Sequence, residues 1–251
     1  MELIFKAGEW EAVLIPYEHE RYNGRRRFCR FLMNEIGFRT IVKVDKVLGL
    51  ENFPSEGPGI VMINHIAFVD PMMVLAKMPR LLVPLGKIEA WHYPIIGIFP
   101  RIWGAIPVHR EGVDRQAIRM AKNVLEAGEL ILMAPEGTRN PNLQEPREGV
   151  AYLGVKTGAP VIPVAVTGTQ GFPTIKPSRW MKPGTVIEVG RPFIFRPPSE
   201  RLTREVLKQM MDETMYVLAS MLPEDLRGVY SDLSNASTDM IEFVDLKART
   251  T

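Results

Sequence analysis

Short runs of branched apolar residues recur along the chain and predict buried β-strands. They cover residues 40–44, 60–63, 81–85, 130–133, 161–166 and 186–189. Near-continuous apolar runs of this length are typical of strands that are covered by other elements on both faces.

Segments between and after these runs have the periodicity of helices instead. Residues 114–127 place apolar side chains on one face, and Gly128 supplies a C-terminal stop. Residues 149–157, followed by Gly158, form a second predicted helix, and residues 201–221 form a longer third one. Alternating strands and helices predict an α/β fold with a largely parallel central sheet flanked by helices. Active residues in such folds usually lie on loops at the carboxyl ends of strands.

The N-terminal region has the pattern of an amphipathic helix. Arg26, Arg27, Arg30 and Asn34 share one helical face, and apolar residues up to Ile36 occupy the other. Such a helix can lie in a membrane interface, or it can pack its apolar face on the domain with its arginines in water. Taken alone, the pattern favours packing on the domain.

Composition narrows the class of protein. The chain has 251 residues, of which 46% are hydrophobic, enough for one compact domain with a sizeable core. Its 31 basic and 29 acidic residues give a net charge of only +2, which argues against a nucleic-acid-binding protein that relies on bulk charge. Cys29 is the only cysteine, so no intrachain disulfide can form and a reducing compartment is expected. No apolar run reaches the roughly 18 residues that a membrane-spanning helix needs.

His65 is the first candidate for chemistry, because it follows directly on the predicted strand 60–63 and should emerge into a loop. A neutral imidazole can take a proton from an alcohol near neutral pH. Asp70 can hold the other ring nitrogen only if the residues between them form a loop, since on a continuous helix the two would lie about 140° apart. Asp70-Pro71 is also a good helix start, so a helix cap beside a buried histidine is the alternative.

Charged residues follow other predicted strands. The segment 104–110 ends in Arg110, and Lys87 follows the strand at 81–85. An arginine at a strand end can clamp a phosphate with two parallel hydrogen bonds, although a simple surface charge would look the same.

A second charged group, Glu136, Gly137, Thr138 and Arg139, follows the strand at 130–133. It suits a polyol phosphate, because glycine permits close approach of the backbone. A tight turn with a local ion pair between Glu136 and Arg139 is the alternative. The segment 161–168 reads as a core strand followed by a bend.

Several familiar motifs are missing from the sequence. It contains no G-x-S-x-G elbow, P-loop, G-x-G-x-x-G or H-E-x-x-H. Four scattered histidines and one cysteine give no pattern for a zinc cluster. With no covalent nucleophile in view, direct transfer to a hydroxyl without a metal or cofactor is the simplest model.

Four stretches resemble, in order and spacing, the four motifs of the glycerolipid acyltransferases. The closest likeness is to bacterial 1-acyl-glycerol-3-phosphate (lysophosphatidic acid) acyltransferases of the PlsC type. The stretches are Asn64-His65 with Asp70, residues 104–110, Pro135-Glu136-Gly137-Thr138-Arg139, and residues 161–168. The likeness extends over roughly residues 44–190, and four motifs in order are far more specific than one.

The resemblance implies roles for individual residues. His65 is similar to the family's general base, and Asp70 to the acid that orients it. Residues 161–168 resemble the segment associated with the acyl donor. Ala67 stands where many members carry serine, and Ala134 where phenylalanine is frequent. The residues that match acceptor-binding positions are Lys87, Arg110, Glu136, Gly137, Thr138 and Arg139.

The activity that the resemblance implies is transfer of a fatty acyl group from acyl-CoA or acyl carrier protein to the free hydroxyl of 1-acyl-glycerol-3-phosphate, forming phosphatidic acid. Glycerol-3-phosphate or another lysophospholipid is an alternative acceptor. A thioester hydrolase and a non-catalytic lipid-binding protein are further alternatives, and intact His65 and Asp70 argue against the last.

The expected organisation follows from this activity. Residues 1–38 form an amphipathic helical segment, residues 39–222 the catalytic domain, and residues 223–251 a C-terminal tail. Because the substrates are lipids, the N-terminal helix becomes the expected membrane-docking surface. The expected location is peripheral, on the cytoplasmic face of the cell membrane.

Overall fold

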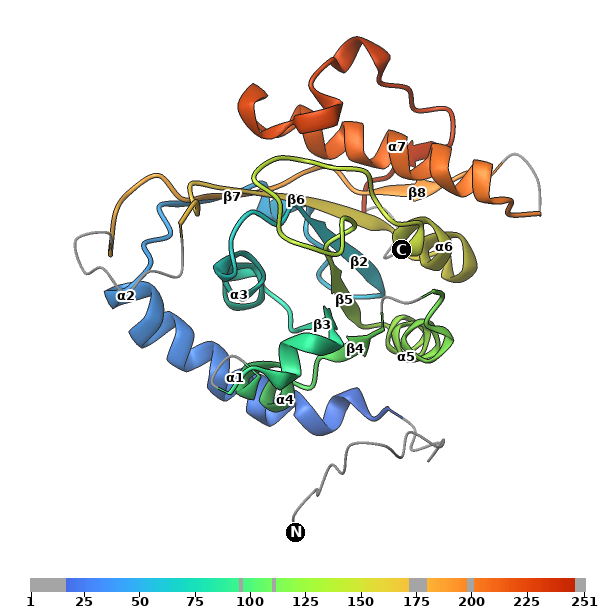
Figure 1. Ribbon diagram of the computed structural model, residues 1–251. Helices are drawn as coiled ribbons and strands as arrows, with labels where there is room; N and C mark the ends of the chain where they lie inside the picture. Colours follow the sequence, from blue (N-terminus) through green and yellow to red (C-terminus); the bar gives the residue numbers. More distant parts are fainter. Residues whose placement is uncertain (1–16, 95–96, 110–111, 172–179, 198–200, 247–251) are drawn as a thin grey trace.

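The computed structural model describes residues 17–94, 97–109, 112–171, 180–197 and 201–246. Its centre is one sheet whose main path has the order β1-β7-β6-β2-β5-β3-β4, with β8 and β9 attached beside β6 (Figure 1). The strands are β1 (Lys46–Leu48), β2 (Gly59–Ile63), β3 (Leu82–Lys87), β4 (Ile106–Val108), β5 (Leu130–Met133), β6 (Val161–Thr167), β7 (Val186–Val189), β8 (Phe193–Phe195) and β9 (Ile241–Phe243).

Most strand pairs in this sheet are parallel, which confirms the predicted fold class. β2 lies in the centre and pairs in parallel with β5 and β6, so that Ile60 is opposite Ile131 on one side and Val161 on the other. β3 and β4 continue the parallel arrangement beyond β5. β7, β8 and β9 run antiparallel to the strands beside them, except that β7 pairs in parallel with β1.

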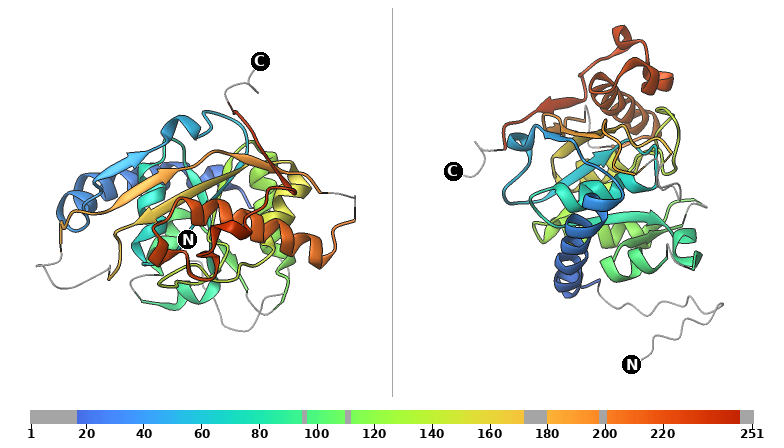
Figure 2. Two further views of the ribbon diagram at one scale, coloured as in Figure 1. Left: turned by 90° about the horizontal axis from the view of Figure 1, so that it is seen from above. Right: turned by 90° about the vertical axis from the view of Figure 1, so that its left-hand side faces the viewer.

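Helices pack against both faces of the sheet. They are α1 (Asn23–Leu32), α2 (Phe38–Thr40), α3 (Val69–Lys77), α4 (Ile98–Trp103), α5 (Arg115–Glu126), α6 (Gly149–Thr157) and α7 (Arg204–Ser220). α1 and α7 lie on opposite sides of the molecule in Figures 1 and 2. Among the described residues, no helix is long and apolar enough to cross a bilayer.

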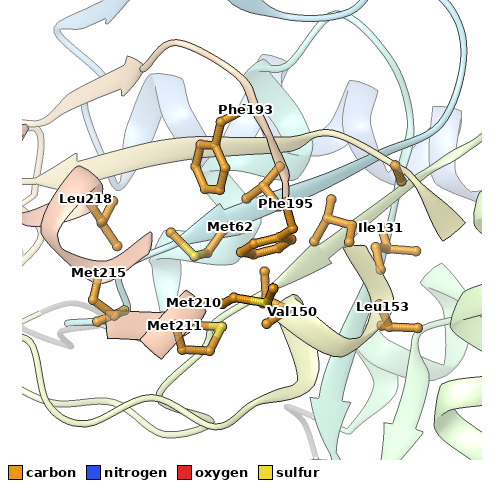
Figure 3. Close-up of a cluster of buried hydrophobic side chains, with 14 of the residues drawn as sticks. Met62, Ile131, Val150, Leu153, Phe193, Phe195, Met210, Met211, Met215 and Leu218 are labelled. Carbon is orange, nitrogen blue, oxygen red and sulfur yellow. The ribbon is translucent and has the colours of Figure 1, made fainter. Parts of the chain in front are cut away.

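The two faces of β2 supply two separate hydrophobic cores, because successive side chains of a strand point to opposite faces. Ile60 and Met62 belong to the core beneath α5, α6 and α7. Figure 3 shows Met62 there among methionines of α7 and the aromatic rings of β8. Val61 and Ile63 belong to the core that includes α3 and Trp103 of α4.

Most predicted elements are confirmed, and the exceptions are short. The predicted strand at 40–44 is wrong, because the N-terminal helix continues to Thr40 and β1 starts only at Lys46. The last long helix starts at Arg204 rather than residue 201, where the Thr203 side chain accepts a hydrogen bond from the Val206 N–H. α4, β8 and β9 were not predicted from the sequence. The division of the chain at residues 38 and 222 remains a prediction.

The N-terminal helix does not pack on the domain by its apolar face alone. Arg26 is buried, with 1% of its surface exposed, whereas Phe28, Phe31 and Ile36 are 62%, 60% and 56% exposed. α1 continues through a π-helical turn, Met33–Gly37, into α2. The prediction that its arginines lie in water is therefore wrong for Arg26.

Backbone carbonyls explain this orientation. Arg26 donates to the carbonyl oxygens of Trp103 and Gly104, at the C-terminal end of α4. Arg30 and Asn34 donate to the carbonyl oxygen of Ala76, near the end of α3. Carbonyls in the last turn of a helix lack intrahelical donors and carry partial negative charge, so they attract guanidinium groups. Arg26, Arg30 and Asn34 are consequently turned inward, together with Cys29 and Met33, which pack against the core that includes α3.

Candidate active site

The loop after β2 is anchored to the neighbouring strand by its first residue. The buried side chain of Asn64 accepts a hydrogen bond from the Val166 N–H at 2.7 Å and donates one to the Val166 carbonyl oxygen at 2.8 Å. Two bonds to one backbone residue hold the end of β2 in register with β6. His65, the next residue, therefore leaves the sheet at a defined position on its carboxyl edge.

His65 and Asp70 meet in this loop, as the sequence predicts. The His65 Nδ1 atom lies 3.4 Å from the Asp70 Oδ2 atom, and Asp70 is completely buried. The same Oδ2 atom accepts hydrogen bonds from the backbone N–H groups of Ile66 and Ala67, at 2.7 Å and 2.6 Å. A contact at Nδ1 leaves Nε2 as the ring nitrogen that can accept a proton from a substrate.

The prediction that Asp70 is the N-cap of a helix is wrong in detail. α3 starts at Val69, and Asp70 lies within its first turn with its carboxylate turned back toward the loop. The unusual Ala67 does not weaken this arrangement, because its contribution is a backbone N–H that any residue except proline supplies.

The third motif folds into a turn that contacts the His65 loop. Gly137 has φ +66°, a conformation that favours glycine, and its N–H donates to the Ala134 carbonyl oxygen. Glu136 is buried and accepts hydrogen bonds from the Asn140 side chain at 2.9 Å and the Gln144 N–H at 3.0 Å. The Asn140 N–H in turn donates to the His65 carbonyl oxygen at 2.9 Å. Glu136, Asn140 and His65 thus form one connected network.

In this geometry the partners of the Glu136 carboxylate are Asn140 and Gln144, whereas the alternative interpretation paired it with Arg139. Burial raises the pKa of Glu136 to about 7, although its bonds to Asn140 and Gln144 act in the opposite direction. Thr138 and Arg139 are exposed at the tip of the turn. Sequence reasoning missed Asn140 and Gln144, and the only available signal was the Asn140-Pro141 pair that marks a turn.

The second motif lies on β4, beside β3. Lys87 ends β3 and is opposite Val108 of β4. The His109 N–H donates to the Asp114 side chain, which also caps α5. Arg110 lies outside the described residues. The motif's first residue, Gly104, has φ +69°, and a β-carbon there would lie 2.3 Å from the Tyr22 ring, so the N-terminal segment packs directly on this turn.

Parallel pairing brings the four motifs to one edge of the sheet. β2, β3, β4, β5 and β6 run in the same direction, so their carboxyl ends lie on the same edge. His65 follows β2, Lys87 ends β3, and Glu136 follows β5. A base, an exposed arginine and a lysine at one such edge can bind an anionic substrate and activate a hydroxyl beside it.

The comparisons with known proteins agree with this geometry. Residues 45–167 match the family model named Acyltransferase. This stretch, 123 of the 251 residues, is similar to that family. The resemblance that the four motifs indicate is thereby confirmed.

Several relatives of this chain are described as 1-acyl-sn-glycerol-3-phosphate acyltransferases. One, from Borreliella burgdorferi, is 32% identical over 130 residues, which cover 50% of this chain and 52% of that protein. Another, from Bacillus subtilis, is 26% identical over 176 residues, or 67% of this chain and 86% of that protein. A chloroplastic relative from Brassica napus is 28% identical, with 60% and 45% covered. The chain spans about half the length of the first relatives that it matches.

A solved structure supports the same fold. The crystal structure of the 1-acyl-sn-glycerophosphate acyltransferase PlsC from Thermotoga maritima superimposes with a TM-score of 0.54 at 21% sequence identity. The match covers 87% of this chain and 81% of that one. At this identity the likeness establishes the fold.

Proposed function

We propose that this protein transfers a fatty acyl group from a thioester donor, acyl-CoA or acyl carrier protein, to the free hydroxyl of 1-acyl-glycerol-3-phosphate. The observation that carries the proposal is the contact between His65 and the buried Asp70 at the sheet edge where the four motifs meet. The product is phosphatidic acid, and the thiol of the donor is released.

His65 acts as the general base. It takes the hydroxyl proton as the acceptor oxygen attacks the thioester carbonyl. The tetrahedral intermediate then collapses with loss of the thiolate, which takes the proton back from the imidazolium. General-base catalysis of this kind contributes about 10²–10⁴ in rate. Asp70 orients the imidazole and stabilises the imidazolium, while the Asn140 N–H holds the backbone of His65.

The acceptor phosphate binds to basic residues along the same edge. Arg139 is exposed at the tip of the third motif, and Lys87 lies at the end of β3, and we assign the phosphate to them together with Arg110 and Thr138. Glu136 and Gly137 serve this site by shaping the turn. Fixing the phosphate positions the hydroxyl near His65 and makes the attack effectively unimolecular.

Thiol release from labelled acyl-CoA tests the activity and separates it from the alternatives. Release that requires lysophosphatidic acid supports the proposal, and release with water alone indicates a hydrolase. No release from either acyl-CoA or acyl carrier protein, with the acceptor present, indicates a lipid-binding protein. Equal lysophosphatidic acid and glycerol-3-phosphate are then offered in competition. Predominant product from glycerol-3-phosphate would overturn the acceptor assignment.

The phosphate assignment has its own variant and control. Arg139→Ala should raise the acceptor KM about tenfold or more and leave the donor KM nearly unchanged, because charge-assisted bonds contribute roughly 1.5–3 kcal/mol. Arg119→Ala, which removes an exposed arginine from α5, is the matched control. Equal kinetics for the two variants would remove Arg139 from the site.

Membrane docking belongs to the same proposal. Phe28, Phe31, Leu32 and Ile36, together called the outer strip, are exposed on the side of the N-terminal helix that faces away from the domain. An exposed apolar strip that includes two phenylalanines, on an enzyme with lipid substrates, fits insertion into the interfacial region of a bilayer. We place the protein peripherally on the cytoplasmic face of the cell membrane, where a free Cys29 stays reduced.

Vesicle co-sedimentation tests the docking surface. Phe28→Ser with Phe31→Ser should weaken binding to neutral phosphatidylcholine vesicles by at least about a hundredfold, since burial of each such side chain contributes about 1.5–3 kcal/mol. Val229→Ser, at another exposed apolar position, is the control and should bind normally. Unchanged sedimentation of the double variant would show that docking occurs elsewhere.

A further inference from the structure

A basic hollow lies beside the N-terminal helix, at the edge of the sheet opposite the edge that carries His65. Its volume is about 320 Å³, and Arg27, Arg30, Arg80 and Glu129 line it. Arg80 precedes β3 and Glu129 precedes β5, so the hollow is at the amino ends of these strands, whereas the four motifs are at the carboxyl ends. The proposed acyl transfer gives no role to these residues, which we call the basic pocket.

The charges of the basic pocket do not balance. Three guanidinium groups face a single carboxylate, Glu129, which lies 3.4 Å from Arg80. Arg30 donates to the carbonyls of Ala76 and Pro79, and these neutral groups position the guanidinium without cancelling its charge.

The guanidinium groups of Arg30 and Arg80 are thus held in place by backbone carbonyls, and that of Arg27 is available to bind a ligand. Arg80 is held by the carbonyls of Gly57 and Gly128. Arg27 is exposed and has no hydrogen bond or ion pair within the described residues. The excess of two positive charges fits one phosphate group, which guanidiniums bind through paired hydrogen bonds.

The neighbourhood of the pocket indicates the source of that phosphate. Phe31 of the outer strip is four residues after Arg27, so the two side chains are neighbours on the helix surface. A phosphate beside Arg27 would therefore have apolar surface one helical turn away, as a phospholipid requires. A soluble phosphate ester would make no use of that surface.

We propose that the basic pocket binds the phosphate of an anionic phospholipid in the membrane on which the outer strip docks. The inference rests on the docking part of the proposed function. It adds a second lipid site, separate from the acceptor site, which gives the protein a preference for anionic membranes.

The test measures that preference directly. Binding constants are compared for vesicles of phosphatidylcholine alone and vesicles in which phosphatidylglycerol replaces part of it, and their ratio is the anionic preference. Arg27→Gln should lower this preference about fivefold, which corresponds to the contribution of about 1 kcal/mol for a basic residue at an anionic surface. Because binding to neutral vesicles measures docking alone, a failure of docking and a failure of the pocket give different results.

Arg25→Gln is the matched control. Arg25 is also exposed on α1, but it is about 200° away from Arg27 around the helix and borders the outer strip from the other side. If the basic pocket binds the lipid phosphate, Arg25→Gln should change the anionic preference less than twofold. Equal losses from the two variants would show attraction by diffuse charge and would overturn the pocket.

A gain-of-function variant strengthens the test. Glu129→Gln removes the negative charge from the pocket and should raise the anionic preference several-fold, whereas Glu126→Gln, on the exposed face of α5, should not. Equal effects of these two variants would contradict the proposal. If the unchanged protein binds inorganic phosphate but shows no preference for anionic vesicles, the ligand is a soluble phosphate and the lipid assignment is wrong.

Discussion

Replacement of Arg26 by methionine tests how the N-terminal helix packs on the domain. The Arg26 guanidinium donates to the carbonyl oxygens of Trp103 at 2.8 Å, His19 at 3.0 Å and Gly104 at 3.2 Å. It also contacts the Tyr17 hydroxyl, and burial lowers the pKa of Arg26 below its ordinary value without removing its charge near neutral pH. Methionine fills a similar apolar volume but donates no hydrogen bond.

The expected cost follows from the Trp103 and His19 carbonyls, which lose the Arg26 donor, whereas the Gly104 carbonyl keeps a hydrogen bond from the Tyr17 hydroxyl. An unsatisfied buried acceptor costs about 1–3 kcal/mol, and removal of the buried charge offsets part of the total. We expect Arg26→Met to lower the free energy of unfolding by about 3 kcal/mol. For a chain of this size that corresponds to a fall in Tm of about 6–12 °C.

Thermal unfolding followed by circular dichroism measures this change. Arg27→Met, at the next and exposed position, is the control and should change stability by no more than about 0.5 kcal/mol. A Tm for Arg26→Met equal to that of Arg27→Met would refute the structural role.

Other predictions concern the candidate active site. His65→Ala should lower turnover at least about a hundredfold with an unchanged circular dichroism spectrum, as loss of a general base predicts. A folded variant that retains most activity would exclude His65 as the base. Asp70→Asn should also be severe, because the imidazole loses its orienting carboxylate, and a kcat near that of the unchanged protein would contradict this. Burial raises the pKa of Glu136 to about 7, so this carboxyl group resists ionisation in the folded protein. Its contribution to stability should therefore fall as pH rises from about 4.5 to about 7. Glu136→Gln should therefore gain stability relative to the unchanged protein across this range in thermal melts, and parallel curves would show that Glu136 does not titrate there.

The sequence by itself predicted most strands of the central sheet and placed His65 at the carboxyl end of one of them. The run at 130–133 coincides with β5, because a strand covered on both faces must be apolar throughout. The run at 186–189 coincides with β7, in which Ile187 and Val189 are buried and Glu188 between them is only partly covered. The position of His65 followed from its place directly after such a run. The loop between His65 and Asp70 followed from helical geometry, which would separate the two side chains.

Only the tertiary structure decided which elements meet. The contact between the Asn140 N–H and the His65 carbonyl joins two loops that are far apart in the chain, and it involves backbone atoms that every residue carries. β8 and β9 are three residues each, too short for a periodic pattern, and pair only because the chain returns after α7.

The orientation of the N-terminal helix was also decided by tertiary contacts. Helical periodicity separates a polar face from an apolar one, but it does not say which of them meets the domain. That choice depends on the carbonyl oxygens of Trp103, Gly104 and Ala76, which are placed by α3 and α4. Because buried carbonyls need donors, they bind the arginine face of the helix and leave the phenylalanines of the outer strip exposed.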